Sequence, residues 1–406
     1  HVINDNSTKG SDAGQDNESE IYYSDYQWQK NLEKYGLRVT IGTTNEIVYA
    51  RSDLFNGKSN RTNNSLYTQL DKKHGRLNIS LGARYENFRL NSNKKYFMEG
   101  DSINSFSAKR PIFRTGLNYQ LAEATYVRGS WGQGYRFPSM AELFISTEIA
   151  KGIWVYPNAS LEPENGWSAE LGIKQGVKVG NWMGYLDLAG FLMQYDDMME
   201  FSFGQWGKNL GDDTTTFPLE TTNMYGLGFK SVNVGKTQIS GVEFSISGQG
   251  KINNNVTINI LAGHTFINAI SLEPDKIYAI GESEQEYTYN NSSSDSTMLK
   301  YRYQHIAKID AEIIYKKLSI GTSFRYNDFM QNIDKIFTEP LINEGIPGVF
   351  DGIPGINTAR EKFKGGDFII DIRAGYQINK NIRLGVIINN LLNREYMSRP
   401  ANMMPQ

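Results

Sequence analysis

Histidines and paired aspartates are the residues of this sequence with potential for acid–base or metal chemistry. The four histidines show no metal-ligand spacing: His1, His74, His264 and His305. Two pairs of adjacent carboxylates could serve hydrolysis or hold a metal: Asp196 with Asp197, and Asp212 with Asp213. Both pairs fall at or beyond the tip of an expected strand, where solvated acidic loops are common, and no Ser-His-Asp set or phosphate-cradling glycine loop accompanies them. The sequence therefore predicts no enzyme, no metal centre and no cofactor.

The composition of the 406 residues is rich in glycine and aromatic residues but hydrophilic on average. With 39 Gly, 24 Tyr, 20 Phe, no Cys and a mean hydropathy of −0.49, the chain is neither a disulfide-stapled module nor typical of disorder. Its 42 basic and 44 acidic residues give a formal charge of −2, so no net basic field gathers nucleic acid. No apolar run reaches 18 residues, so a transmembrane helix is not expected.

Hydropathy alternates with a period of two along much of the chain, which is typical of β-strands with two different faces. In the segment DFIIDIRAGYQI, which begins at Asp367, apolar residues alternate with polar ones. Similar runs begin at Arg76, Ser240, Val256 and Leu318. The sequence thus predicts an all-β protein built of amphipathic strands.

Fourteen such runs form seven pairs, each joined by a turn of a few residues such as KKHG or LAEA. The pairs are 20–31 with 36–51, 63–72 with 76–91, 109–120 with 124–136, 166–178 with 181–203, 238–250 with 255–267, 301–315 with 318–328, and 367–377 with 382–393. Much longer connections separate the pairs, as in 137–165, 204–237, 268–300 and 329–366. Tight turns at one end and long loops at the other are typical of an antiparallel transmembrane β-barrel. A soluble sandwich, the alternative, does not usually place every long connection on one side.

In such a barrel, alternate side chains of each strand face lipid and lumen. The positions expected to face lipid are Phe368, Ile370, Ile372, Leu77, Ile79, Leu81, Val242, Phe244 and Ile246. The positions expected to face the lumen are Asp371, Arg373, Arg84, Glu86 and Glu243. His264 and His305 share the outward face of neighbouring strands near the upper interface, where an imidazole is tolerated as an amphipathic group. We favour that ordinary role over a ligand role.

The two ends of the sequence lie on the long-loop side of the expected barrel, whereas bacterial barrels of this type place both termini with the short turns. We therefore expect residues 1–406 to be one partial barrel domain, the C-terminal part of a larger barrel without its first strands and its last strand. The fourteen strands are then expected to leave two open backbone edges rather than to close on themselves.

Five segments carry a family resemblance, and they follow one another in the family's order. GQGYRFPSMAELF from Gly132, PNASLEPENGWSAELGIK from Pro157 and NNLLNREYMSRP near the C-terminus are similar to motifs of TonB-dependent outer-membrane receptors. GARYENF and GKTQISGVEFSISG resemble two strands of the same family. The resemblance implies a barrel of twenty-two strands behind an N-terminal plug. The fourteen strands here would be the eighth to the twenty-first.

The resemblance implies a multi-pass protein of the bacterial outer membrane that imports a scarce solute by energised transport. In this family TonB, driven by the inner-membrane proton gradient, pulls on the plug. The implied cargo is a ferric siderophore or another metal chelate such as cobalamin, and the implied partners are TonB, lipopolysaccharide and, in some branches, a surface lipoprotein. The alternatives are a passive porin or adhesin-like barrel and a receptor that imports glycans or peptides.

Candidate ligand-binding residues lie in the long loops, which are binding surfaces on a rigid scaffold. The aromatic candidates are Trp154, Tyr156, Trp206, Phe217, Phe337 and Phe350. The cationic candidates, suited to anionic solutes such as ferric catecholates, are Arg360, Lys362 and Lys364, with Lys151 and Arg136. These cations could instead pair with anionic lipopolysaccharide, and the sequence leaves both readings open. For Arg136 a structural bond to a neighbouring loop is a third option.

The segment between Pro138 and Pro163 bears on the choice of cargo, because haem receptors of this family typically carry a histidine there. The segment contains no His, and imidazole is a common axial ligand of haem iron. Met140 or Tyr156 would have to replace it, or the plug would have to supply the ligand. We therefore rank a ferric siderophore first and cobalamin second, above haem.

Overall fold

The computed structural model describes residues 2–3, 17–52, 57–98, 101–150, 153–206, 227–280, 284, 286–294, 298–338, 355–399 and 402–404. Its main element is a sheet of fifteen strands, all paired antiparallel and in chain order. The strands are β1 (Val2–Ile3), β2 (Asn17–Leu32), β3 (Leu37–Ser52), β4 (Gly57–His74), β5 (Leu77–Met98), β6 (Asp101–Ala122), β7 (Thr125–Arg136), β10 (Glu164–Val179), β11 (Asn181–Asp196), β14 (Thr237–Lys251), β15 (Val256–Ser271), β18 (His305–Tyr315), β19 (Leu318–Asn327), β20 (Asp367–Gln377) and β21 (Arg383–Ile388).

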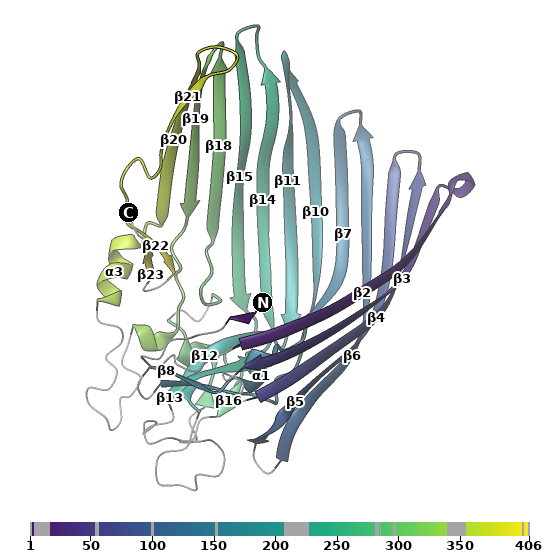
Figure 1. Ribbon diagram of the computed structural model, residues 1–406, viewed down its shortest axis with the longest axis vertical. Coiled ribbons are helices and arrows are strands. Elements are labelled where there is room, and N and C mark those ends of the chain that lie inside the picture. The colour runs from purple at the N-terminus through teal and green to yellow at the C-terminus, as the bar shows by residue number, and fades with distance from the viewer. Residues whose placement is uncertain are drawn as a thin grey trace.

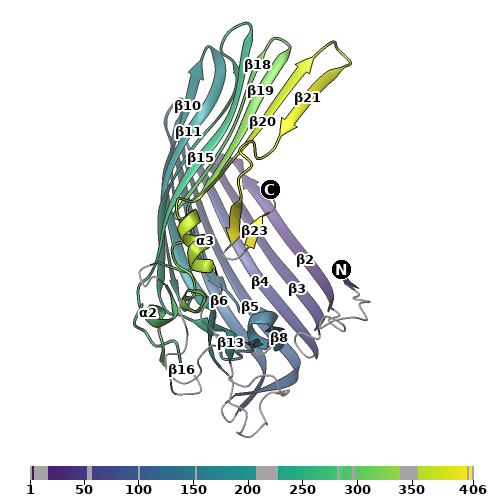
Figure 2. The same cartoon turned by 90° about the vertical axis from the view of Figure 1, so that its left-hand side faces the viewer.

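The large sheet curves into an open trough (Figures 1 and 2). The tight turns gather at one end of the trough, and the longer connections lie at the other end (Figure 1). Strand β2, with the two-residue β1 beside one end of it, stands at one side and β21 at the other, and within the described residues the two sides are not hydrogen-bonded neighbours. The prediction of an antiparallel sheet that does not close with fourteen strands is confirmed.

The fourteen predicted runs all occur as strands in the predicted pairs, but 382–393 is a strand only over Arg383–Ile388, and a second run is interrupted. The run 181–203 is not a single strand, because β11 ends at Asp196 and Asp197 adopts a left-handed φ of 55°. An aspartate tolerates this conformation, which ends an extended ladder. The chain then enters β12 (Met199–Gln205), which belongs to a different sheet. The prediction of one continuous strand over 181–203 is therefore wrong.

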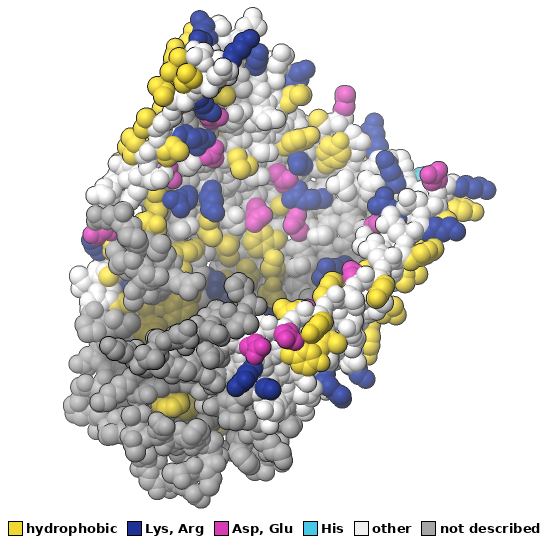
Figure 3. All heavy atoms as spheres, in the orientation of Figure 1, with side chains coloured by type: hydrophobic (Ala, Val, Ile, Leu, Met, Phe, Trp, Pro, Cys, Tyr) yellow, Lys and Arg dark blue, Asp and Glu magenta, His cyan; other side chains and the backbone are white. Residues whose placement is uncertain are grey.

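The register places the charged side chains of neighbouring strands on one common face. On this face Arg128 of β7 bonds Glu170 of β10 at 2.7 Å and Asp187 of β11 at 2.8 Å. Arg373 of β20 bonds Asp310 of β18 at 2.7 Å across the intervening strand β19. Figure 3 shows basic and acidic side chains scattered over the concave face, with hydrophobic side chains along the outside.

The orientation prediction is confirmed by this register. Asp371 pairs with Ser323, which in turn pairs with Asp310, so Asp371 shares the concave face. Arg84 and Glu86 share that face and contact each other. The opposite face carries the nine apolar positions predicted to meet lipid, as the alternation along β5, β14 and β20 requires.

Glycines allow close approach at the tight-turn end of the sheet. In the turn between β2 and β3, Gly36 has a left-handed φ of 54°, and a Cβ there would lie 2.5 Å from the Lys73 carbonyl oxygen. On the outer face, Trp182 packs over Gly184 and Gly248 of neighbouring strands, and a Cβ on Gly248 would lie 2.3 Å from the indole. These positions explain part of the high glycine content.

The remaining elements gather at the long-loop end of the trough (Figures 1 and 2). We call the following set the outer cap: α1 (Met140–Phe144), β8 (Thr147–Ala150), β9 (Ile153–Tyr156), β12, β13 (Leu227–Asn233), β16 (Ala279–Ile280), β17 (Glu286–Tyr287), α2 (Tyr289–Ser292), the 3-10 helix η3 (Lys335–Phe337) and α3 (Ile356–Phe363). Outside it lie the 3-10 helix η1 (Glu33–Tyr35), β22 (Tyr396–Arg399) and β23 (Asn402–Met404). None of the helices in the described part of the chain has both the length and the apolarity to span a bilayer.

A four-stranded sheet in the order β12-β13-β9-β8 organises the outer cap. Its strands come from the two connections that follow β7 and β11, and β9 pairs with β13 in parallel. Two long loops are thereby joined into one folded unit.

Candidate functional site

The outer cap has a packed core of its own. One apolar cluster consists of Tyr156, Met198, Trp206, Val232, Val234, Ala269, Tyr287, Tyr289 and Leu299. A second cluster joins the cap to the inner face of β5 and consists of Phe88, Leu90, Leu143, Phe144, Leu161 and Met199. Buried apolar area of this kind holds the long connections in one arrangement. The cap is therefore one folded unit with a shared core at the end of the trough rather than a set of independent loops.

Three of the predicted ligand-binding aromatics belong to this core. Tyr156 is 3% exposed and Trp206 8% exposed, and the Trp206 indole donates a hydrogen bond to the Gly228 carbonyl at 3.1 Å. The Trp206 and Tyr287 rings lie 4.7 Å apart. Trp154 is partly buried against the same cluster. In this arrangement the three predicted side chains support the cap from within and present little surface to a ligand.

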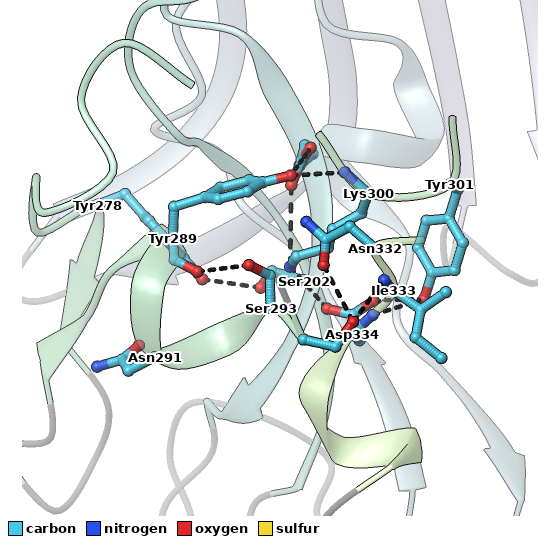
Figure 4. A network of polar contacts seen from close by, with 12 residues as sticks. Ser202, Tyr278, Tyr289, Asn291, Ser293, Lys300, Tyr301, Asn332, Ile333 and Asp334 are labelled. Carbon is cyan, nitrogen blue, oxygen red and sulfur yellow. Dashed lines mark hydrogen bonds and ion pairs between the residues drawn. The ribbon is translucent and has the colours of Figure 1, made fainter. Parts of the chain in front are cut away.

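A buried polar network ties three segments of the cap together (Figure 4). Lys300 is its centre, with its ammonium 2.7 Å from Asp334 and 3.8 Å from Glu200. The side chains of Lys300 and Asp334 are each only 2% exposed. Asp334 also accepts a hydrogen bond from the Tyr301 hydroxyl at 2.7 Å, and the Tyr289 hydroxyl accepts one from the Lys300 backbone at 2.6 Å. The network therefore links β12, the segment after α2 and the segment before η3.

Charge balance in this network is incomplete, because one lysine faces two buried carboxylates. Burial raises the pKa of Glu200 above its usual range, and Asp334 raises it further, while Lys300 acts in the opposite direction. For Lys300, burial alone would lower the pKa, but the attraction of Asp334 and Glu200 outweighs it and the pKa is raised. Lys300 thus stays charged, and the Glu200 carboxyl holds its proton more firmly than an exposed one does.

A cluster of phenylalanines occupies the other face of β12 and β13. The rings of Phe201 and Phe229 stack with centroids 4.9 Å apart and planes 5° apart. Phe203 meets Phe229 edge to face at 5.0 Å, and Phe337 of η3 lies 6.4 Å from Phe229. Phe201 is 47% exposed although it is a large apolar residue. We call these four residues the aromatic platform.

The cationic helix α3 lies next to η3 and hence next to the aromatic platform. Asn357 of α3 donates a hydrogen bond to the Thr338 carbonyl at 3.1 Å, directly after Phe337. Arg360 donates to the carbonyls of Met330 at 3.0 Å and Gln331 at 2.7 Å, so its guanidinium is committed to the backbone.

The two lysines at the end of α3 are more exposed than Arg360. Lys364 pairs with Glu361 at 2.9 Å, and both side chains are largely exposed. Lys362 pairs with Glu395 at 2.8 Å and borders a hollow of about 570 Å³ that Phe368 also lines. Phe368 belongs to the outward face, so Lys362 lies toward the membrane side of the rim. Surface pairs of this kind contribute little to stability and can exchange for another anion.

Arg136 at the end of β7 makes the structural bond that was one of its three options. Its guanidinium contacts both oxygens of Glu164, at 2.9 and 3.0 Å, and Glu142 at 2.6 Å. Glu142 completes a capping box with Ser139 at the start of α1. Burial would raise the pKa of Glu142, but hydrogen bonds from Arg136 and Ser139 lower it below the usual value. Arg136 therefore anchors α1 to the top of β10.

The remaining predicted candidates are dispersed or lie outside the described residues. Asp196 and Asp197 form long, partly exposed contacts with Lys236 and Lys276. The predictions on His1, Lys151, Asp212, Asp213, Phe217 and Phe350 concern residues outside the described ranges. Within those ranges no three potential metal ligands of the His, Cys, Asp and Glu types come together.

Sequence patterns did not single out the polar network or most of the aromatic platform. Lys300 and Asp334 are 34 positions apart in sequence and lie on the irregular segments before β18 and after β19, where no periodicity marks a contact. Phe201, Phe203 and Phe229 do alternate with smaller residues, which is the signal of a short strand with one aromatic face. The arrangement of platform and cationic helix can bind a flat or anionic solute, and it offers no set of groups for bond cleavage.

Comparison with protein families gives one match over nearly the whole chain. A family described as "TonB dependent receptor-like, beta-barrel" matches residues 2–391. A comparison with curated proteins gave no match.

Solved structures with the same fold share little sequence with this chain. The copper transporter OprC has 12% identity and a TM-score of 0.61, over 94% of this chain and 52% of that one. The hemophore receptor HasR of Serratia marcescens, solved with its hemophore HasA and heme, has 14% identity and a TM-score of 0.60, over 95% and 58%. The ferric-catecholate import receptor Fiu from E. coli K12 has 14% identity and a TM-score of 0.57, over 94% and 52%. The chain spans little more than half the length of these structures.

Proposed function

Because this chain belongs to the TonB-dependent receptor β-barrel family of outer-membrane transport proteins, we propose that it forms the ligand-capturing part of a receptor that imports a metal chelate. The energy for import would come from TonB acting on a plug. The proposed cargo is a ferric siderophore first and cobalamin second.

The observation that carries the proposal is the aromatic platform beside a cationic helix at the mouth of the trough. Aromatic faces bind flat conjugated ligands, and cations beside them favour ligands that also carry negative charge. Ferric catecholates combine both properties. The name of one structural neighbour, the ferric-catecholate import receptor Fiu, supports the same class of cargo.

Within this proposal the predicted residues have different roles. Phe337 and Lys364 are proposed to contact the cargo, with Arg360 holding the loop beneath them. Trp154, Tyr156 and Trp206 are proposed to contribute through the packed core of the cap. Lys362, which borders the outward hollow, is proposed to meet the phosphate groups of lipopolysaccharide instead.

The low rank of haem is supported by the surroundings of Tyr156 and Met140, the two residues that would have to replace a histidine as axial ligand. Tyr156 is buried in the cap core, and Met140 packs against the second apolar cluster. Neither side chain is available as an axial ligand without a rearrangement of the cap. The names of two neighbours speak of heme and of copper, so haem and free metal belong among the tested cargoes.

Binding titrations on the complete receptor test this function with ferric catecholate, cobalamin, haem and oligosaccharide as separate ligands. Phe201→Ala should weaken binding of the catecholate about three- to tenfold, since an aromatic pair contributes ~0.5–1.5 kcal/mol beyond its buried area. Phe113→Ala is the matched control, because Phe113 is similarly exposed but lies on the lipid-facing side of β6. Tight haem binding that survives loss of every plug histidine, or binding of oligosaccharide alone, would contradict the proposal.

A further inference from the structure

Two histidines of neighbouring strands meet on the outer face of the sheet. His264 of β15 pairs with Ala307 in the register, and His305 of β18 pairs with Phe266, so the two histidines are diagonal neighbours. The Nε2 atom of His264 lies 3.2 Å from the Nδ1 atom of His305. The centroids of the two imidazole rings are 5.4 Å apart and the rings are nearly parallel. The centroid of the Phe266 ring lies 5.0 Å from that of the His305 ring. The Phe266 contact restricts the His305 ring from one side.

The register fixes the height of this pair in the membrane. His264 lies eight residues beyond Val256, where β15 leaves the short turn. At about 3.3 Å per residue and a strand tilt of 35–45°, it stands roughly 20 Å above that turn, near the top of an apolar band ~25 Å tall. Phe244 pairs with His264, and Tyr326 pairs with Ala307, so aromatic side chains flank the histidines at the same level.

The two strands that carry the histidines each have a further strand paired on their other side. β14 and β19 are both in place beside β15 and β18, so the histidines lie away from the two open sides of the sheet. His264 is exposed on this face. Its ring is therefore open to the headgroup layer and the external medium.

The distance between the two ring nitrogens suits a shared metal ion. Zinc binds imidazole nitrogen at about 2.0–2.1 Å, so two such ligands at a tetrahedral angle lie about 3.3–3.4 Å apart. The observed 3.2 Å separation corresponds to nearly the same angle. Imidazole is a preferred ligand of the late first-row dications, and such sites bind Cu²⁺ more tightly than Zn²⁺.

We propose that His264 and His305 chelate a late first-row transition-metal dication at the outer membrane interface. The described residues provide no third His, Cys, Asp or Glu at this point. The remaining coordination positions would therefore be open to water or to an anionic group of a neighbouring lipid. The proposed site faces the membrane and is separate from the cargo surface of the outer cap.

Metal titration of the complete, untagged receptor in detergent tests the site, with Cu²⁺ or Zn²⁺ alone as the probe. The variants are His264→Gln and His305→Gln, and His74→Gln is the matched control because His74 ends β4 beside a tight turn at the far end of the sheet. Each variant of the pair should lower affinity at least about tenfold, since loss even of an outer-shell partner of a metal ligand typically costs 10–100-fold. The paramagnetic resonance spectrum of bound Cu²⁺ should show coupling to the nitrogens of two imidazoles in the wild type, reduced coupling in each single variant and none from this site in the double His264→Gln, His305→Gln variant.

The outcomes separate the proposal from an ordinary pair of hydrogen-bonded histidines. Equal binding by the wild type and the double His264→Gln, His305→Gln variant would overturn it, as would loss of binding in His74→Gln alone. Thermal unfolding of each variant without metal shows whether the barrel is intact, and the imidazole coupling of Cu²⁺ reports on the ligands even if stability changes. Cargo binding in the same variants is expected to be unchanged.

Discussion

Replacing Lys300 by methionine is expected to loosen the whole outer cap while the trough beneath stays folded. Lys300 forms ion pairs with two buried carboxyl groups, and its ammonium lies 2.7 Å from Asp334. Methionine has a similar length and would fill much of the space without the charge. Of the two side chains that lie 2.7 Å from the Asp334 carboxylate, the Tyr301 hydroxyl would then remain and the ammonium would be gone.

The expected cost follows from the burial of the pair. Breaking a buried ion pair by removing one partner typically costs ~3–5 kcal/mol, because the remaining charge has no compensation. That range corresponds to an opening equilibrium larger by roughly 10²- to several 10³-fold. The affected segments are those that the network joins, namely 199–205, 286–294 with 298–300, and 331–337.

Hydrogen exchange of backbone amides on the complete receptor measures this directly, because it reports opening segment by segment. Lys364→Met is the matched control, since Lys364 forms a pair of similar length with Glu361 that is largely exposed. That control should cost less than ~1 kcal/mol. Protection of the three segments that changes equally little in both variants would refute the reasoning, as would loss of protection spread evenly over the barrel strands.

Three further expectations follow from the fold. Ile246→Lys should destabilise the barrel by ~2–4 kcal/mol in a urea titration from lipid vesicles, because Ile246 faces the hydrocarbon, whereas the adjacent lumen position in Ser245→Lys should change little. Gly248→Ala should lower stability by ~1–3 kcal/mol in the same assay through collision with the neighbouring indole, whereas Gly116→Ala meets its nearest side chain at an ordinary 3.9 Å. Burial raises the pKa of Glu200, so its contribution to cap stability is present at low pH and is lost as pH rises through the folded-state pKa. Amide protection of the cap in Glu200→Gln should therefore exceed that of the wild type at high pH and match it at low pH. Equal unfolding free energies of Ile246→Lys and Ser245→Lys would contradict the first expectation, and equal unfolding free energies of Gly248→Ala and Gly116→Ala would contradict the second. Equal amide protection of Glu200→Gln and the wild type at every pH would contradict the third.

The trough could be predicted from the sequence because its contacts are local and repeat. Every second side chain of a strand faces the same side of the sheet, either lipid or lumen. Asp371 and Arg373 could therefore be assigned to the lumen from their positions in this alternation alone. The break at Asp197 could not, because a left-handed aspartate leaves no mark in the alternation of the residues around it.

The outer cap was beyond prediction for the opposite reason. Its contacts join segments far apart in sequence, and Tyr156 and Trp206 look like exposed loop aromatics until the core that covers them is known. The histidine pair is an intermediate case. The alternation of strand faces placed His264 and His305 on one face. The distance between their rings, however, depends on which diagonal of the twisted sheet brings side chains together.

The parallel pairing of β9 with β13 has a consequence for the order of assembly. Trp154 aligns with Gly228, 74 residues later, and the hairpin β10–β11 lies between them in sequence. Hairpins close quickly because their partners are neighbours, whereas a pairing over this distance must wait for the intervening chain to be in place. We therefore expect the strands to insert first and the mouth to form last. A receptor caught between these two stages would already span the membrane but would have no surface with which to hold its ligand.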